Sequence, residues 1–398
     1  MKAATPRRLK TFVCSLLRLS AYLSAPGDGR PQGQIPARVL LWAQLAGLLL
    51  RETSFHAIEA LVRSRARAAL GVGRRFGDDA LAYFTERLAP APTRLALVSI
   101  LRQSKRNKAF DTARFLGLAL DGTGVARCRQ QRCRLCHPVQ DSQQQISSYV
   151  HHFSLISVVG HEELTLPFDV EPYGPKDSEA AASRRLLERA VQHLGPRFAD
   201  YVVADGLYAT APFLHLAGEL GLYAIVRLKA NLPTLYQQAQ TRLLDTPPTQ
   251  VFSIGRDRIE AWDADDFDPW DSLPWPTVRV LRYRQHRPDG TVCEAYWLTD
   301  FPTQKLSTQT LFRLAKSRWQ IENYGFNEGK NRYGLEHLPH HHPNSLLIHW
   351  LLVSLALTIE RLYRLRYLKR GTHRPYTPIE FLRLLRLSLA RPQPADTS

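Results

Sequence analysis

The sequence predicts a mixed α/β protein with a helical N-terminal region and a β-rich insertion in its second half. Three observations predict this fold class. Up to about residue 107, apolar residues recur every three or four positions, which is the spacing of amphipathic helices. After residue 110, short apolar runs alternate with helical segments, as in an α/β sheet. From about 230 to 305, tryptophans, acids and prolines interrupt that alternation.

Charge and length limit the classes of partner. The 398-residue chain carries 53 Lys and Arg against 36 Asp and Glu, a formal net charge of +17. Such a surplus favours a polyanionic partner, nucleic acid first and an anionic membrane surface second. The longest apolar runs, 39–50 and 346–359, are shorter than the roughly 18–20 residues that cross a bilayer, so we expect buried helices and no membrane. Five cysteines favour a reducing compartment over a secreted disulfide framework.

The N-terminal region, residues 1–110, is predicted to be a helical, basic domain that binds DNA. Helical spacing runs from 35 to 107, and Asp78 or Asp79 is placed to cap a helix over 80–88. The cations that this region offers to phosphates are Arg63, Arg65, Arg67, Arg74, Arg75, Lys105, Arg106 and Lys108. The alternative is that these side chains form the solvated face of a support domain.

Residues 111–370 are predicted to form the α/β core, followed by a tail over 371–398. The expected strands are 115–120, 148–159, 164–170, 201–204 and 223–228, and the expected helices are 178–194, 212–220, 308–330 and 346–367. The turn 160–162 joins the second and third strands into a hairpin. Within the β-rich insertion, about 230–305, we expect 278–285 to pair with 291–298.

Three acids occupy special places in this topology. Asp121 is expected to end the first strand, Asp205 the fourth, and Glu322 lies on the helix that follows the insertion. Ends of adjacent central strands lie side by side, and a helix packed across them can add one further carboxylate. Three oxygen ligands suit Mg²⁺ or Mn²⁺ rather than zinc, and a pair of such ions can activate water in phosphodiester cleavage.

The neighbouring residues support this site. Gly122 and Gly206, directly after the two aspartates, leave backbone room for a phosphate or an ion, although each Asp-Gly pair alone is an ordinary turn signal. Arg318 and Lys330 flank Glu322 on one broad helix face. That face could equally be an intrahelical ion pair in water. Helix glycines at 325 and 329 indicate close approach to a neighbouring element, because glycine costs nearly 1 kcal/mol there.

With these residues in view, the chain resembles a DDE transposase of the bacterial insertion-sequence type over about 114–366, which implies an RNase H-like mixed sheet. Asp121, Asp205 and Glu322 match the metal-binding triad of that family, and the sequence Arg-Trp-Gln-Ile-Glu over 318–322 matches the start of its signature helix. Ala315 replaces the family's tyrosine. At the position where the family has a lysine, this chain has Gly329, and Lys330 follows one residue later.

The resemblance implies divalent-metal-dependent cleavage at transposon ends and strand transfer into target DNA. Asp121, Asp205 and Glu322 would be the catalytic residues and the ligands of two Mg²⁺ (or Mn²⁺) ions, and Arg318 and Lys330 would bind DNA. The implied partner is double-stranded DNA, bound by a homodimer in the bacterial cytoplasm at the nucleoid. Two alternatives stay open: a catalytically inactive DNA-binding derivative, and a metal-dependent nuclease without strand transfer.

Two further groups of residues have both a functional and a purely structural interpretation. A tryptophan of the insertion region could stack on a flipped base, although packing is the favoured role; the candidates are Trp262, Trp270, Trp275 and Trp297. A short segment offers four zinc ligands, namely Cys128, Cys133, Cys136 and His137. Because the usual distant second pair is missing, reduced loop thiols are favoured over a structural zinc. The histidines at 337 and 340–342 are expected to form a polar loop.

Overall fold

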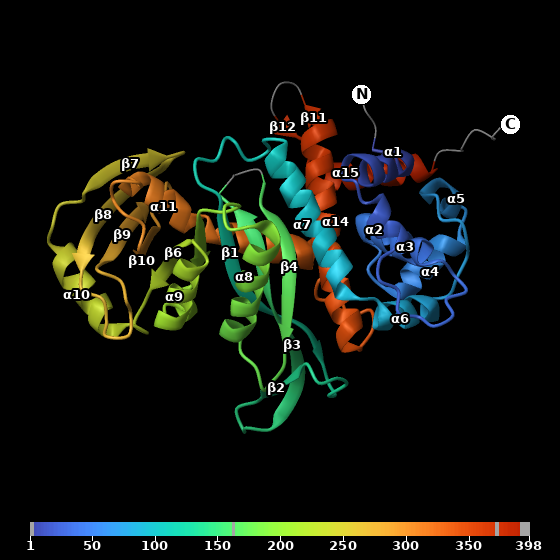
Figure 1. The fold of residues 1–398 in the computed structure, drawn as a ribbon, viewed down its shortest axis with the longest axis horizontal. Coiled ribbons are helices and arrows are strands. Elements are labelled where there is room, and N and C mark those ends of the chain that lie inside the picture. Colours follow the sequence, from blue (N-terminus) through green and yellow to red (C-terminus); the bar gives the residue numbers. More distant parts are fainter. Residues whose placement is uncertain (1–3, 161–163, 371–373, 391–398) are drawn as a thin grey trace.

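A ten-stranded mixed sheet runs through the molecule, and most of the helices of the N-terminal region stand at one side of it (Figure 1). The computed structural model describes residues 4–160, 164–370 and 374–390. The strand order is β2-β3-β1-β5-β6-β10-β9-β8-β7, and β4 also pairs with β3. The strands are β1 (Gly117–Cys128), β2 (Cys136–Gln140), β3 (Ile146–Val159), β4 (Leu166–Tyr173), β5 (Tyr201–Ala204), β6 (Tyr223–Leu228), β7 (Gln250–Ile254), β8 (Asp257–Phe267), β9 (Val278–His286) and β10 (Val292–Thr299).

Helices flank this sheet and build the N-terminal region. They are α1 (Pro6–Thr11), α2 (Ser20–Ser24), α3 (Ala37–Leu49), α4 (Phe55–Arg63), α5 (Ala66–Leu70), α6 (Asp78–Arg87), α7 (Pro90–Arg106), α8 (Glu179–Leu194), α9 (Ala211–Glu219), α10 (Pro233–Leu244), α11 (Thr308–Lys316), α12 (Arg318–Ile321), α13 (Glu328–Tyr333), α14 (Pro343–Tyr367) and α15 (Pro378–Ala390). Helix α6 starts at Asp78 with Gly77 as its N-cap, so the aspartates lie in its first turn rather than at the cap.

The predicted fold class is confirmed: an RNase H-like mixed sheet with flanking helices, a β-rich insertion and an N-terminal helical region. Strand β1 pairs antiparallel with β3 and parallel with β5, and β5 pairs parallel with β6. The hairpin of β3 and β4 is also present, while residues 161–163 of its predicted turn lie outside the described residues.

The insertion extends the main sheet instead of forming a separate one. Its hairpin β9–β10 pairs as predicted, and β10 also pairs antiparallel with β6. The insertion begins with α10, a helix that the sequence reasoning missed. Leu235, Ala239 and Leu243 of this helix are buried; they recur every four residues after a proline in the first turn, which is a helical pattern.

Two elements near the predicted site differ from expectation. Strand β1 does not end before Asp121 but continues to Cys128, because β3 pairs with it along most of that length. The helix expected over 308–330 is broken into α11, α12, a π-helical turn (Glu322–Asn327) and α13. Such turns inside helices are often found at functional sites.

Helix α14 joins the two halves of the structure. It lies between the sheet and the N-terminal helices (Figure 1) and packs on β4, α3, α6 and α7. Its 25 residues are long and apolar enough to cross a membrane, but 89% of its most apolar window is buried inside the protein. The prediction of a buried core helix is therefore confirmed. Its buried Glu360 pairs with Arg51 at 2.6 Å, and its buried Arg361 pairs with Glu328 at 2.7 Å.

Candidate active site

Two of the predicted acids lie at the same level of neighbouring strands. The parallel pairing of β1 and β5 runs from Gly117 opposite Tyr201 to Ala119 opposite Val203. Asp121 and Asp205 each follow two residues beyond that last pair. Because neighbouring strands are about 4.8 Å apart, the sheet register places the two aspartates side by side.

An arginine connects the third acid to the first. Arg318 donates from Nη1 to Asp121 Oδ2 at 3.2 Å and from Nη2 to Glu322 Oε1 at 2.5 Å. The Arg318 side chain is only 8% exposed. The structure therefore brings Asp121, Arg318 and Glu322 together, and Arg318 lies between the two carboxylates rather than free in solvent.

Three contacts hold this part of the chain against the sheet. Ser317 Oγ lies 2.9 Å from the hydroxyl of Tyr201 at the start of β5. Gln320 Oε1 accepts from the backbone N–H of Gly160 at 3.1 Å and from the Thr165 hydroxyl at 3.2 Å. These bonds fix α12 across the strands and so position Arg318 and Glu322.

Gly325 allows the π-helical turn to approach the sheet closely. A Cβ atom on Gly325 would lie 2.9 Å from Leu155 Cδ2 of β3, closer than ordinary van der Waals contact. Leu155 is paired with Asp121 across the sheet, so both residues face the same side. The close approach predicted from this glycine is confirmed.

A fourth carboxylate, Glu179, reaches the same region from the other face of the sheet. A Cβ atom on Gly122 would overlap its side chain, and Tyr208 and Tyr173 donate to it at 2.9 and 3.4 Å. The expectation that Gly122 leaves room for an ion or a phosphate is therefore wrong: Glu179 takes that room. Sequence reasoning missed Glu179 because an acid in the first helical turn after a capping residue, Ser178, is an ordinary signal.

The pKa values of the two aspartates shift in opposite directions. Burial raises the pKa of Asp121 to about 7; Arg318 opposes this rise, whereas the Glu322 and Glu179 carboxylates add to it. Burial also raises the pKa of Asp205, but hydrogen bonds from Lys229, at 2.8 Å, and from the Gly206 N–H outweigh it and leave the pKa below its ordinary value. For Asp121 burial thus outweighs the nearby Arg318 charge, whereas for Asp205 the hydrogen bonds outweigh burial and favour the ionised form.

These residues fit hard divalent cations by the chemistry of their donors, because carboxylate oxygens suit Mg²⁺ and Mn²⁺. Their oxygens are not all within 4.8 Å of one another, since the three acids form no such group among the residues that the structure describes. The Arg318 guanidinium stands between two of them. Cation binding by Asp121 and Glu322 together requires Arg318 to withdraw.

Lys330 lies further along β1. Its Nζ donates to the Gly124 carbonyl at 3.3 Å and lies 3.4 Å from Glu336. Gly124 and Glu336 both line a hollow of about 760 Å³, and this hollow also includes the cation Arg127. Lys330 thus contacts two of the residues that line this hollow.

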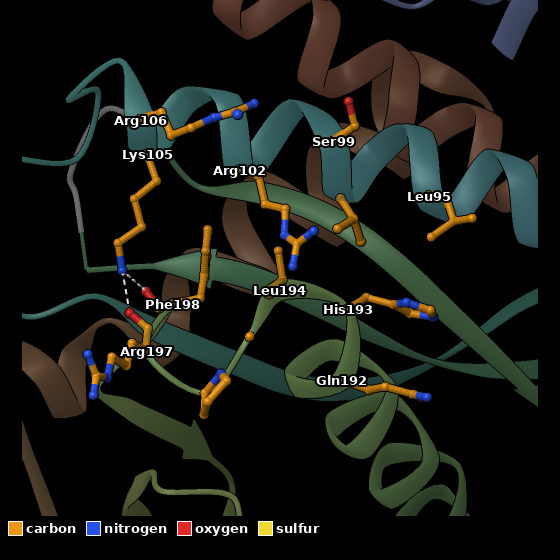
Figure 2. A pocket seen from close by; sticks show the side chains of 13 residues that line it. Leu95, Ser99, Arg102, Lys105, Arg106, Gln192, His193, Leu194, Arg197 and Phe198 are labelled. Atoms are coloured by element: carbon orange, nitrogen blue, oxygen red, sulfur yellow. Dashed lines mark hydrogen bonds between the residues drawn. The ribbon is translucent and has the colours of Figure 1, made fainter. Parts of the chain in front are cut away.

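A second hollow, of about 830 Å³, lies between α7 and residues 192–198 and contains none of the predicted acids (Figure 2). Lys105 extends across it and donates to the carbonyl oxygens of Arg197 and Phe198 at 2.7 and 2.5 Å. Arg102 and Arg106 also line it. Lys105, predicted as a phosphate contact, is here a link between α7 and the core.

The four tryptophan candidates divide into two pairs. Trp262 and Trp297 are buried, 5% and 0% exposed, and Trp262 Nε1 donates to the Thr246 carbonyl at 2.7 Å. Trp270 and Trp275 are half-buried at the edge of the core. Packing, the favoured role, is confirmed for the first pair.

A family model described as a transposase DDE domain matches residues 113–359. The matched segment begins just before β1 and ends within α14, so it contains the three predicted acids, Arg318 and Lys330. A search of curated proteins finds no match.

Proposed function

The chain belongs to the transposase DDE domain family, and on that premise we propose that it cuts DNA at the ends of a mobile element and joins those ends to target DNA. Transposases bind DNA, and this family acts in transposition. The proposal extends to a bacterial insertion sequence as the element, to a homodimer that holds two ends, and to the cytoplasm as the compartment.

One observation carries the proposal. Arg318 links Asp121 to Glu322, and the strand register sets Asp205 beside Asp121. Carboxylates that are 201 positions apart in sequence thus gather at one place, and the family model spans all of them.

Asp121, Asp205 and Glu322 are the residues that would hold two Mg²⁺ or Mn²⁺ ions; Glu179, which approaches Gly122 from the other face of the sheet, adds negative charge nearby. When bound, such ions activate the attacking oxygen and stabilise the leaving oxygen of a phosphodiester. Burial raises the pKa of Asp121 to about 7, and Asp121 would bind an ion in its deprotonated form.

The cations near the acids have a matching role. Arg318, once withdrawn from the carboxylates, presents a planar fork that binds phosphate bidentately. Lys330, bonded to β1 three residues beyond Asp121, supplies a point charge for the neighbouring phosphate. The net charge of +17 steers the chain toward double-stranded DNA.

The test uses a supercoiled plasmid that carries the inverted repeats flanking this gene, incubated with the purified chain and Mg²⁺. We expect excised and joined products. Asp121→Asn, Asp205→Asn and Glu322→Gln should each abolish cleavage and retain DNA binding. Glu188→Gln is the matched control, because Glu188 is an exposed acid that pairs with Arg184 on α8.

Other results would identify the alternatives. Cleavage that needs no repeats and yields no joined products indicates a nuclease without strand transfer. Binding to the repeats without any cleavage indicates an inactive DNA-binding derivative. Full cleavage by any one of the three acid variants overturns the assignment of the site.

A further inference from the structure

Three cysteines and a histidine converge where β1, β2 and β3 meet. Cys133 Sγ and Cys136 Sγ lie 3.3 and 3.4 Å from His151 Nε2, and the two sulfurs are 3.7 Å apart. The ligand atoms of Cys128, Cys136 and His151 all lie within 4.8 Å of one another. Cys136 and His151 are buried, and the other two residues are half-buried. We propose that these four side chains bind one zinc ion.

The spacing of the Cys133, Cys136 and His151 ligand atoms matches a tetrahedral zinc site. With Zn–S near 2.3 Å and Zn–N near 2.0–2.1 Å, tetrahedral geometry places two sulfurs about 3.8 Å apart and a sulfur and a nitrogen about 3.6 Å apart. The observed separations of 3.7, 3.4 and 3.3 Å differ from these by a few tenths of an ångström. A Cys₃His set is one of the ordinary structural zinc sites.

The sheet register explains which histidine takes part. Cys136 of β2 lies directly opposite His151 of β3, so their side chains share one face of the sheet. His137 is the next residue along β2 and therefore points to the other face, where its Nε2 donates to the Tyr173 carbonyl at 2.9 Å. The candidate ligand set that the sequence offered, but did not favour, contains His137; the proposed set contains His151 instead.

A distortion of β1 brings Cys128 to the same face. The pairing of β1 with β3 shifts between Val125 and Cys128, and Ala126 there has φ +50°, which is an unusual conformation for a residue with a Cβ. After this shift Cys128 pairs with Tyr149, two residues from His151 and on its face. A bulge that re-aims a side chain in this way is typical of functional positions.

The other ring nitrogen of His151 is also placed for ligation. Its Nδ1 faces the carbonyl of Ala126 at 3.5 Å, so Nδ1 carries the proton and Nε2 presents its lone pair to the sulfurs. Histidine ligands of zinc are usually oriented by such a second hydrogen bond.

A zinc ion at this position would connect the far end of β1 to the β2–β3 ribbon, which projects from the body of the molecule (Figure 1). It would also fix the loop that carries the exposed side chains of Arg129, Arg132 and Arg134. That these arginines then contact DNA rests on the proposed function; the zinc site itself does not.

The experiment measures metal content in the full chain, purified without a histidine tag or chelator. We expect about one zinc per chain. Cys128→Ser, Cys133→Ser, Cys136→Ser and His151→Ala should each lose most of it. The matched controls Cys14→Ser, Cys293→Ser and His137→Ala should keep it.

A second measurement needs no variant and so does not depend on their folding. Wild-type chain, stripped of metal under reducing conditions, is titrated with Co²⁺. We expect sulfur-to-cobalt charge-transfer bands and tetrahedral ligand-field bands that saturate at about one equivalent.

Clear results would overturn the site. These are wild-type chain with neither zinc nor the cobalt spectrum, a Cys133–Cys136 disulfide in chain whose free thiols are alkylated at cell lysis, or zinc that is lost by His137→Ala and kept by His151→Ala. Zinc content is read independently of DNA cleavage. A chain that binds zinc but cuts no DNA would fail the proposed function and leave this site standing.

Discussion

Arg318 donates a hydrogen bond to Asp121 at 3.2 Å across 197 positions of sequence. The same guanidinium holds Glu322, so one buried cation pairs with two of the carboxylates that the proposed function assigns to metal ions. This arrangement makes Arg318 a competitor of the divalent cations as well as a candidate phosphate contact.

Arg318→Ala should destabilise the metal-free chain by about 3 kcal/mol, because removing one partner of a buried ion pair leaves the other charge uncompensated. Magnesium should restore part of that loss, since a bound cation replaces the missing positive charge. The measurement is urea unfolding of wild type and variant with and without millimolar Mg²⁺. An equal effect of Mg²⁺ on both chains would show that the acids bind the ion independently of Arg318.

Glu179→Gln tests the fourth carboxylate. Its negative charge contributes to the raised pKa of Asp121. Its loss should weaken cation binding by about tenfold, which corresponds to about 1.4 kcal/mol of binding free energy. The glutamine oxygen can still accept from Tyr208, so the fold should persist. The readout is the Mg²⁺ concentration for half-maximal cleavage, with Glu188→Gln as control. An unchanged Mg²⁺ requirement would limit Glu179 to a structural role.

The sequence predicts most of the sheet because its central strands are short apolar runs. It misplaces the end of β1 because Gly122 and Gly124 look like turn residues, whereas pairing with β3 keeps them in the strand. It also misses β2, a five-residue strand at the sheet edge in which only Cys136 is buried. Local patterns report burial and turns, but not which strand is available as a partner.

The same limit applies to the site. Asp121, Asp205 and Glu322 could be selected from strand ends and a helix motif, and the structure places them near one another. The contact of Arg318 with two of these acids depends on how α12 crosses the sheet. His151 could not be selected as a zinc ligand, because its meeting with Cys136 is set by the β2–β3 register.

Gly325→Ala should destabilise the chain by about 1–2 kcal/mol and reduce cleavage, because its Cβ would press on Leu155 and shift the turn that carries Glu322. Gly218→Ala is the matched control: it lies in α9 with open space around it, and should stabilise by about 0.4–1 kcal/mol. Thermal and urea unfolding measure both effects. The double variant Leu155→Ala with Gly325→Ala should be less destabilised than the sum of the two single changes predicts. Strictly additive free energies of unfolding would contradict the clash.

His349 should make the folded state sensitive to acid. Burial lowers its pKa to about 4, although the bond from its Nε2 to the Gly334 carbonyl opposes this. The unfolded chain takes up the proton near pH 6.5 and the folded chain does not. Stability is therefore full above pH 6.5 and falls by about 3 kcal/mol as the pH drops to 4. His349→Gln should remove this component of the pH profile, and His215→Gln, on the surface of α9, should not. Identical pH profiles for wild type and His349→Gln would mean that His349 titrates alike in both states.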